Sequence, residues 1–302
     1  LKSFREVLVS SEPDLQKMTG LSRPDVQELL HAAASACRTR QPITLQLQRG
    51  ECRRLESGLR LGTGCPVLDQ LLRGGLPAGG VTELAGASGA GKTQLGLQLC
   101  LSVQYPVEHG GLSAALYICT EDPFPIRRLQ QLISEQPSLR SDVPPSLIGR
   151  LRFSDNIYLE HAADLQDSLQ VCLSRRAALL LAQGRVRLVV VDSVAALFRS
   201  EFQPGDWLER NKQLLTVSSM VHHLSHEFTT PVLCINQVSP ALGLAWANQV
   251  TVRLMLRRLQ ATVSRGDQSS ALRRLEVVFA PHLAQSSRDV AVWREGLRGV
   301  LD

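Results

Sequence analysis

The chain has 302 residues, of which 44% are hydrophobic and 4% aromatic, and its formal net charge is +5. This length accommodates one large domain and a small one, with a core built mainly from aliphatic side chains. No uncharged apolar run approaches the roughly 20 residues that cross a bilayer, so we expect no membrane-spanning segment and no membrane partner. Seven scattered cysteines, without a C-x-x-C pair, argue against a disulfide framework or a zinc site.

Residues 1–37 predict a small helical domain, in which two short helices are joined by a tight turn at Thr19-Gly20-Leu21. Ser22 followed by Asp25 has the spacing of a capping box at the start of the second helix. This arrangement resembles a helix-hairpin-helix, whose turn can present backbone N–H groups to a DNA phosphate. A plain helical hairpin that packs only on itself explains the same residues.

Residues 38–60 form a polar linker that is rich in arginine and glutamine. Within it, Ile43-Thr44-Leu45-Gln46-Leu47 alternates between apolar and polar residues, as a half-buried strand does. No partner strand is predicted nearby, so this segment is a candidate for addition to the sheet edge of another subunit.

Residues 61–302 predict one α/β domain with a mostly parallel sheet. Its four main strands are nearly continuous runs of Val, Leu and Ile, typical of parallel strands buried on both faces, at residues 81–85, 114–120, 188–192 and 232–236. Helical segments alternate with them, as in a doubly wound sheet, at residues 127–135, 165–181 and 211–228. Three further strands predict an antiparallel extension near the C-terminus, at residues 250–256, 275–279 and 290–293.

A glycine-rich segment follows the first main strand. It reads Gly86-Ala87-Ser88-Gly89-Ala90-Gly91-Lys92-Thr93 and matches the phosphate-binding pattern G-x-x-x-x-G-K-[ST] at every fixed position. Its glycines let backbone N–H groups turn toward a phosphate at the N-terminus of the helix predicted at 93–103. Lys92 can reach the β- and γ-phosphates, and the Thr93 hydroxyl can ligate Mg²⁺. The segment therefore predicts a site for a nucleoside triphosphate and Mg²⁺.

Polar residues also follow the other main strands. Asp192 ends one strand, at the place where P-loop proteins hold Mg²⁺ with a carboxylate. Glu121 follows another strand and can activate a water for attack on the γ-phosphate, although a solvated turn residue is the alternative. Gln237 closes a fourth strand and can sense the γ-phosphate. Because the carboxyl ends of parallel strands share one edge, we expect these three residues to lie together with Lys92.

Arginines are concentrated near the C-terminus, where one acidic residue within the same stretch, Asp267, opposes them. They indicate either a basic surface for nucleic acid or the solvated face of a strand pair. The sequence weighs these two interpretations about equally for Arg253, Arg257, Arg258, Arg265, Arg273 and Arg274.

The ordered set of motifs resembles the eukaryotic RecA-type recombinases and their paralogues. The resemblance covers nearly the whole chain and rests on Thr63-Gly64, Leu68-Asp69, Leu71-Leu72, Gly74-Gly75, Gln94, Tyr117-Ile118, Thr120-Glu121, Val191-Asp192-Ser193 and Asn236-Gln237-Val238. Further segments, such as Ser239-Pro240-Ala241-Leu242-Gly243, are similar to one particular paralogue of this group. The resemblance implies a RecA-like P-loop ATPase core over residues 61–302, preceded by a small helix-hairpin-helix-like domain.

The resemblance also implies roles for individual residues. It implies that Lys92 and Glu121 act in catalysis and that Thr93 and Asp192 hold Mg²⁺. ATP would then be bound by residues 86–93 together with three further polar residues, Gln94, Arg128 and Gln237. Arg128 falls where the family places an arginine near the adenine, and Pro281 falls in a segment that caps ATP across a subunit boundary.

The implied function is that of an ATP-binding mediator in homologous-recombination repair of DNA breaks, located in the nucleus with the cytoplasm as a second location. The implied partners are the recombinase paralogue lettered C, in a heterodimer, the eukaryotic recombinase itself, and single-stranded or branched DNA. One DNA-contacting loop is expected near residues 201–211, where Trp207 and Arg210 are the useful side chains, and core packing or surface charge explains them equally well. A second loop, which the family places after the Asn-Gln pair, is almost missing between Val238 and Ala241.

Two other functions remain open from the residues. One is a self-sufficient DNA-dependent ATPase that forms its own strand-exchange filament, and the other is a hexameric helicase-type P-loop ATPase. Glu121 keeps the first open, whereas the linker lacks the aromatic anchor by which the recombinases polymerise. The motifs from Thr63 to Gly75 and the N-terminal hairpin argue against the second. The sequence does not decide whether the chain hydrolyses ATP beyond a weak DNA-dependent rate.

Overall fold

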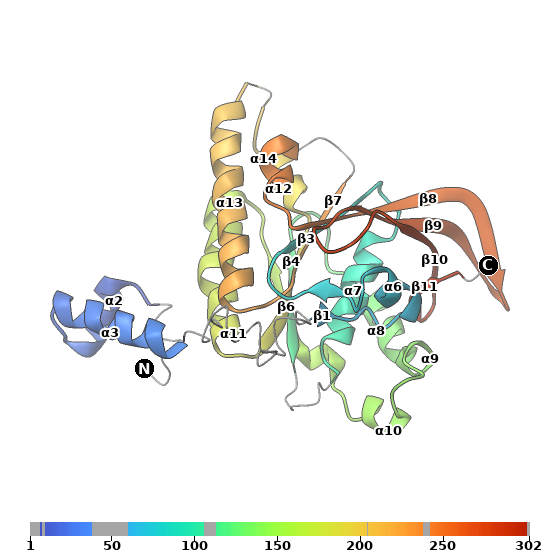
Figure 1. The fold of residues 1–302 in the computed structure, drawn as a ribbon, viewed down its shortest axis with the longest axis horizontal. Coiled ribbons are helices and arrows are strands. Elements are labelled where there is room, and N and C mark those ends of the chain that lie inside the picture. Colours follow the sequence, from blue (N-terminus) through green and yellow to red (C-terminus); the bar gives the residue numbers. More distant parts are fainter. Residues whose placement is uncertain are drawn as a thin grey trace, which may run out of the picture.

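The computed structural model describes residues 7, 10–37, 60–105, 113–203, 205–237 and 242–300. It contains a helical hairpin at the N-terminus and an α/β domain built around a nine-stranded sheet (Figure 1). The linker strand predicted at 43–47 and the segment 238–241 lie outside the described residues. Among the helices that the structure describes, none is long and apolar enough to cross a membrane.

The N-terminal hairpin consists of α2 (Glu12–Thr19) and α3 (Arg23–Cys37). Gly20 makes the turn between them, and its φ of 71° is a left-handed conformation that favours glycine. Three buried apolar side chains, Val7, Leu15 and Val26, form the small core that holds the two helices together. The predicted pair of helices around a Gly-centred turn is therefore present.

The large sheet has the strand order β11-β10-β9-β8-β3-β7-β6-β4-β5. Neighbouring strands run parallel from β8 to β5 in this order and antiparallel from β8 to β11. The parallel part contains β3 (Val81–Gly86), β4 (Ala114–Cys119), β5 (Ile157–His161), β6 (Val186–Asp192) and β7 (Val232–Gln237). The antiparallel part contains β8 (Val252–Arg265), β9 (Gln268–Phe279), β10 (Ser287–Trp293) and β11 (Gly296–Gly299). A separate small ladder pairs β1 (Arg60–Leu61) with β2 (Leu76–Pro77).

Helices cover both faces of the parallel part of this sheet (Figure 1). One core lies between the sheet and α6 (Pro66–Leu71), α7 (Lys92–Ser102), α8 (Ile126–Ser134) and α10 (Pro145–Ile148). The other lies under η2 (Leu165–Gln170), η3 (Cys172–Ala177), α11 (Ala178–Ala182), α12 (Val194–Ser200), α13 (Trp207–Glu227) and α14 (Gly243–Ala247). Successive residues of β4 alternate between the two cores, Tyr117 in the first and Ile118 in the second. The short α9 (Gln136–Leu139) follows α8, and η1 (Phe153–Asn156) leads into β5.

Several predicted boundaries differ from the structure. The helix predicted at 165–181 is π-helical in η2 and η3 before it becomes α-helical in α11. The hairpin of β8 and β9 is much longer than predicted, because its outer part is polar and gives no apolar alternation. Strands β5 and β11 were not predicted: β5 has partly exposed polar residues, and β11 begins and ends with glycine.

Candidate nucleotide-binding site

The phosphate loop connects the end of β3 to the start of α7, as the sequence predicts. A Cβ on Gly86 would lie 2.4 Å from the Leu256 carbonyl oxygen, so no side chain fits there. Gly91 has φ of 105° and directly precedes α7, whose N-terminal N–H groups open into a cavity of about 400 Å³. The loop therefore offers backbone donors and the positive end of a helix dipole to an anion in that cavity.

Lys92 is the cation of this loop. Its Nζ donates to the carbonyl oxygens of Gly86 at 2.8 Å and Ala87 at 2.9 Å. Burial lowers the pKa of Lys92, and the carboxylates of Asp192 and Glu121 oppose that effect. The ammonium group is thus held inside the loop, with acidic residues close enough to stabilise its charge.

Thr93 and Asp192, which are predicted to hold Mg²⁺, are in direct contact. The Thr93 hydroxyl donates to Asp192 Oδ2 at 2.9 Å, and the buried Tyr117 hydroxyl donates to the same oxygen at 2.7 Å. No described residue donates to the other oxygen, Oδ1. Hydroxyl and carboxylate oxygens are hard donors of the kind that Mg²⁺ prefers, and Mg²⁺ commonly uses one or two protein carboxylates beside substrate phosphates. These two residues therefore fit a magnesium ion that is shared with a polyphosphate.

Glu121 and Gln237 line the same cavity as Lys92 and Asp192, so the four predicted residues share one site. Glu121 also pairs with Arg199 of α12, whose Nη2 lies 3.3 and 3.4 Å from its carboxylate oxygens. The sequence reasoning missed Arg199, because nothing in the local pattern of α12 indicates a contact with the end of β4. Because the guanidinium contacts both carboxylate oxygens, Arg199 competes with an attacking water for them.

The cavity is also lined by Gln94, Arg128, Arg273 and Val292. Arg128 donates from Nε to Gln94 Oε1 at 2.6 Å and from Nη2 to the Trp293 carbonyl oxygen at 2.7 Å. It therefore ties α8 to α7 and to the end of β10. Arg273 lies against the phosphate loop, and its Nε donates to the Ala90 carbonyl oxygen at 2.8 Å. Arg273 was predicted only as one of the C-terminal arginines, because its approach to the loop depends on how the sheet folds.

Most of the C-terminal arginines form ion pairs with acidic residues of other segments. These pairs are Arg253 with Glu83, Arg257 with Glu276, Arg265 with Glu295 and Arg274 with Asp289. Asp267, expected to oppose them, instead pairs with Arg294 at 2.7 Å. The structure thus favours a charged strand pair over a continuous free basic surface, because acidic residues outside or late in the stretch pair with four of its arginines.

The other predicted functional residues lie outside this cavity. Trp207 begins α13 and its side chain is 64% exposed, which excludes core packing as its role. Arg210 is half-buried in the first turns of the same helix, and its N–H donates to the Asp206 carbonyl oxygen. Pro281 is exposed just after β9, beside His282, which contacts Arg60 at 3.0 Å.

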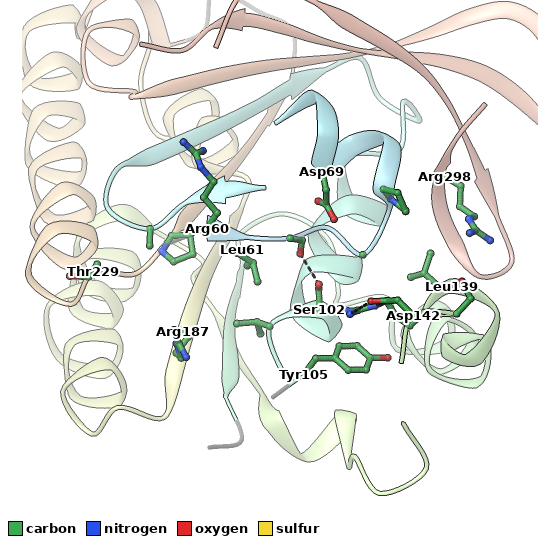
Figure 2. A pocket seen from close by; sticks show the side chains of 18 residues that line it. Arg60, Leu61, Asp69, Ser102, Tyr105, Leu139, Asp142, Arg187, Thr229 and Arg298 are labelled. Atoms are coloured by element: carbon green, nitrogen blue, oxygen red, sulfur yellow. Dashed lines mark hydrogen bonds and ion pairs between the residues drawn. The ribbon is translucent and has the colours of Figure 1, made fainter. Parts of the chain in front are cut away.

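A second cavity, of about 360 Å³, lies near the N-terminal ends of β6 and β7 (Figure 2). One of its arginines, Arg140, already has partners, since it pairs with Asp142 at 2.8 Å and lies 4.1 Å from the centre of the Tyr105 ring. Arg60 likewise contacts His282. None of the predicted nucleotide-binding residues lines this cavity, so we place the candidate site at the phosphate loop.

Comparisons with known proteins agree with this fold. A family model described as Rad51 matches residues 54–298, and one described as XRCC3/RpoA-like, helix-hairpin-helix domain, matches residues 1–37. The chain is 49% identical over 324 residues to DNA repair protein XRCC3 of Mus musculus and 51% identical over 318 residues to that of Bos taurus. These alignments cover 99% of this chain in both cases, and 93% and 92% of the two relatives.

DNA repair protein RAD51 homolog 2 of Mus musculus is 33% identical over 240 residues, which cover 78% of this chain and 67% of that protein. The predicted resemblance to the RecA-type recombinase paralogues, and within them to X-ray repair cross-complementing protein three, is confirmed by these similarities. The RecA-like core and the helix-hairpin-helix domain are likewise confirmed. The chain belongs to the Rad51 family.

Proposed function

We propose that this chain is an ATP-binding mediator of homologous-recombination repair of DNA breaks, acting within a complex of Rad51-family paralogues. One observation carries the proposal: Lys92, Thr93 and Asp192 line a single cavity at the phosphate loop, and the Thr93 hydroxyl contacts the Asp192 carboxylate. The similarity to DNA repair proteins of the Rad51 family over nearly the whole chain supports the pathway. It does not favour a helicase or a self-sufficient strand-exchange enzyme.

Different residues of the site bind different parts of ATP. The N–H groups of residues 86–93 and the Lys92 ammonium bind the β- and γ-phosphates, while Tyr117 and Thr93 orient the Asp192 carboxylate. A magnesium ion held by Thr93 and Asp192 would neutralise charge on these phosphates. Gln94 and Arg128 contact the nucleoside end, and Gln237 senses the γ-phosphate at the end of β7. The ion pair between Glu121 and Arg199 supports slow hydrolysis, so that bound ATP mainly controls assembly.

We further propose that the chain pairs with the recombinase paralogue lettered C, assists the eukaryotic recombinase, and binds single-stranded or branched DNA in the nucleus. Trp207 and Leu208, 64% and 69% exposed at the start of α13, support a contact with unstacked bases. The proposed division is a helical domain at 1–37, a linker at 38–60 and the ATPase domain at 61–302.

The test is equilibrium binding of a fluorescent ATP analogue with Mg²⁺ to the full chain, purified with the paralogue. Lys92→Ala removes the ammonium group and should weaken binding at least about tenfold, the value of one lost charge-assisted hydrogen bond. Lys212→Ala, on the exposed side of α13, is the matched control and should bind normally. Equal affinity of Lys92→Ala and wild type would contradict the assignment. A filament or a hexamer formed by this chain alone would favour the other two functions.

A further inference from the structure

Arg273 is a charged residue of the nucleotide cavity that the proposed function does not yet use. It lies in the middle of β9, where it pairs in register with Arg258 of β8 and Val290 of β10. Its Nε donates to the Ala90 carbonyl oxygen, and its Nη1 donates to the Ser270 hydroxyl at 3.1 Å. A Cβ on Gly91 would lie 3.4 Å from Arg273 Nε and 3.3 Å from Val292, so both side chains pack directly on the loop.

The charge of Arg273 has no acidic partner. Within the described ranges no carboxylate forms an ion pair with Arg273 or with Arg258, whereas their neighbours Arg257 and Arg274 both have one. Burial lowers the pKa of Arg273, and the charge of Arg258 lowers it further. A cation that is partly desolvated beside a like charge has an unfavourable environment, which an anion in the adjacent cavity would relieve.

The position of Arg273 indicates which end of that anion its guanidinium contacts. The γ-phosphate end is marked by Lys92, whose charge interacts with Asp192 and Glu121. Arg273 lines the same cavity as Gln94 and Arg128 and contacts the phosphate loop at Ala90, not at Lys92. Adjacent residues of β10 connect the two arginines, since Val292 packs on the loop beside Arg273 and the Trp293 carbonyl accepts from Arg128.

Resting on the proposed nucleotide function, we propose that Arg273 is a nucleotide-binding residue of this same chain, whose guanidinium Nη2 donates to the α-phosphate, at the ribose end of the bound nucleotide. Nε and Nη1 have protein acceptors, and no described residue accepts from Nη2. Both ATP and ADP carry an α-phosphate, so Arg273 serves affinity for either nucleotide. Recognition of the γ-phosphate stays with Lys92 and Gln237.

The experiment measures Mg-ATP and Mg-ADP affinities of the wild-type chain in its paralogue complex and of Arg273→Gln, Arg273→Lys and the control Arg274→Gln. Arg274 is the next residue on β9 but pairs with Asp289 at 2.7 Å outside the cavity. Arg273→Gln should weaken ATP and ADP by similar factors of about tenfold or more, the usual effect of one charge-assisted hydrogen bond. Arg273→Lys should recover part of the affinity, and Arg274→Gln should match wild type.

Sulfur-substituted nucleotides distinguish a direct contact between Arg273 and the α-phosphate from a purely structural role in shaping the loop. Sulfur at the α-phosphate should weaken wild type more than Arg273→Gln, because only wild type has the donor to lose; sulfur at the γ-phosphate should weaken both equally. Additive effects at both positions, a loss of ATP affinity alone, or unchanged affinities in Arg273→Gln would overturn the inference. If wild type itself binds neither nucleotide, the proposed function fails instead.

Discussion

The two halves of the large sheet hold their charges in different ways. In the parallel half, β3 to β7, acidic groups lie in buried positions or at the carboxyl ends of strands, as Glu83 and Asp192 do. In the antiparallel half, β8 to β11, charges are spread along the strands and pair across them, as Arg257 does with Glu276 and Arg274 does with Asp289. Helices cover both faces of the parallel half, whereas the outer part of the β8–β9 hairpin is exposed (Figure 1).

This difference indicates how to interpret a charged residue in this fold. A charge that is buried in a doubly covered strand loses its hydration and is stable only with good partners, so such a charge indicates a hydrogen-bond network or a functional site. An exposed cross-strand pair keeps much of its hydration and contributes little, with a typical value of about 0–1 kcal/mol. The same residue types therefore carry large energetic consequences in one half and small ones in the other.

The largest effect on stability is expected at Glu83, in the middle of β3. Its carboxylate accepts from Asn236 Nδ2 at 2.8 Å, Trp246 Nε1 at 2.8 Å and Arg253 Nε at 2.6 Å. Glu83→Ala leaves these three donors without their acceptor, and we expect a loss of about 3–5 kcal/mol, as for a broken buried ion pair. Urea unfolding of the full chain measures it.

Glu276→Ala is the matched change in the antiparallel half, since it removes the acidic partner of the half-exposed Arg257. It should destabilise by less than about 1 kcal/mol. Equal losses in Glu83→Ala and Glu276→Ala would break the proposed difference between the two halves.

The sequence predicts the parallel half well and the antiparallel half less well. Strands β3, β4, β6 and β7 are continuous apolar runs with a recognisable signal, and the spacing of the phosphate loop fixes Lys92 and Thr93. The long hairpin of β8 and β9 carries exposed charges whose pairing does not follow a simple alternation. Its length therefore could not be derived from the pattern alone.

The side chains that contact the predicted site residues from distant parts of the sequence could not be predicted either. Tyr117 reaches Asp192 across 75 residues of sequence, Arg199 reaches Glu121 across 78, and Arg273 reaches Ala90 across 183. Tyr117 was predicted as part of a buried strand and of the family motif Tyr117-Ile118, without a contact to Asp192. Such contacts depend on strand order and register, which set which side chains meet at one edge of the sheet.

The next prediction concerns the ion pair between Glu121 and Arg199 at the edge of the parallel half. Glu121→Gln should leave ATP binding intact and slow any hydrolysis about 100-fold, because an amide cannot accept the proton of the attacking water. Arg199→Gln should raise the rate, since it frees the carboxylate. Single-turnover hydrolysis with and without DNA measures both, and identical rates in all three proteins would remove Glu121 from catalysis.

A smaller effect is expected for Tyr117→Phe, which removes the buried hydroxyl that orients Asp192. The change should destabilise the fold by about 1 kcal/mol and weaken ATP binding only when Mg²⁺ is present. Tyr105→Phe is the control, because it removes a comparable buried hydrogen bond, to Gln136 at 2.8 Å, outside the nucleotide site. Titrations of ATP with and without Mg²⁺ compare the two. A magnesium-dependent loss of the same size in Tyr105→Phe would contradict a specific role for Tyr117.

The smallest effect is expected at Glu295, in the antiparallel half of the sheet. This carboxylate is buried between β10 and β11, where Arg265 donates to it and Arg298 lies 3.5 Å away. Burial alone would raise the pKa of Glu295, but the hydrogen bond from Arg265 and the charges of both arginines outweigh burial and hold the pKa below its ordinary value. Because the folded-state pKa is the lower one, the ion pairs stabilise the fold above the unfolded pKa of about 4.3, and this contribution is lost as the pH falls through the folded value.

Glu295→Gln should therefore be less stable than wild type by about 0.5–1 kcal/mol at neutral pH, since Arg265 is 46% exposed and solvent screens the pair. The difference should stay constant from pH 8 to pH 5 and shrink below about pH 4. Thermal unfolding of both proteins across this range measures it. A difference that grew toward acid pH would show that the buried carboxyl group is stabilised in its protonated form, and the arginines would then not be its dominant partners.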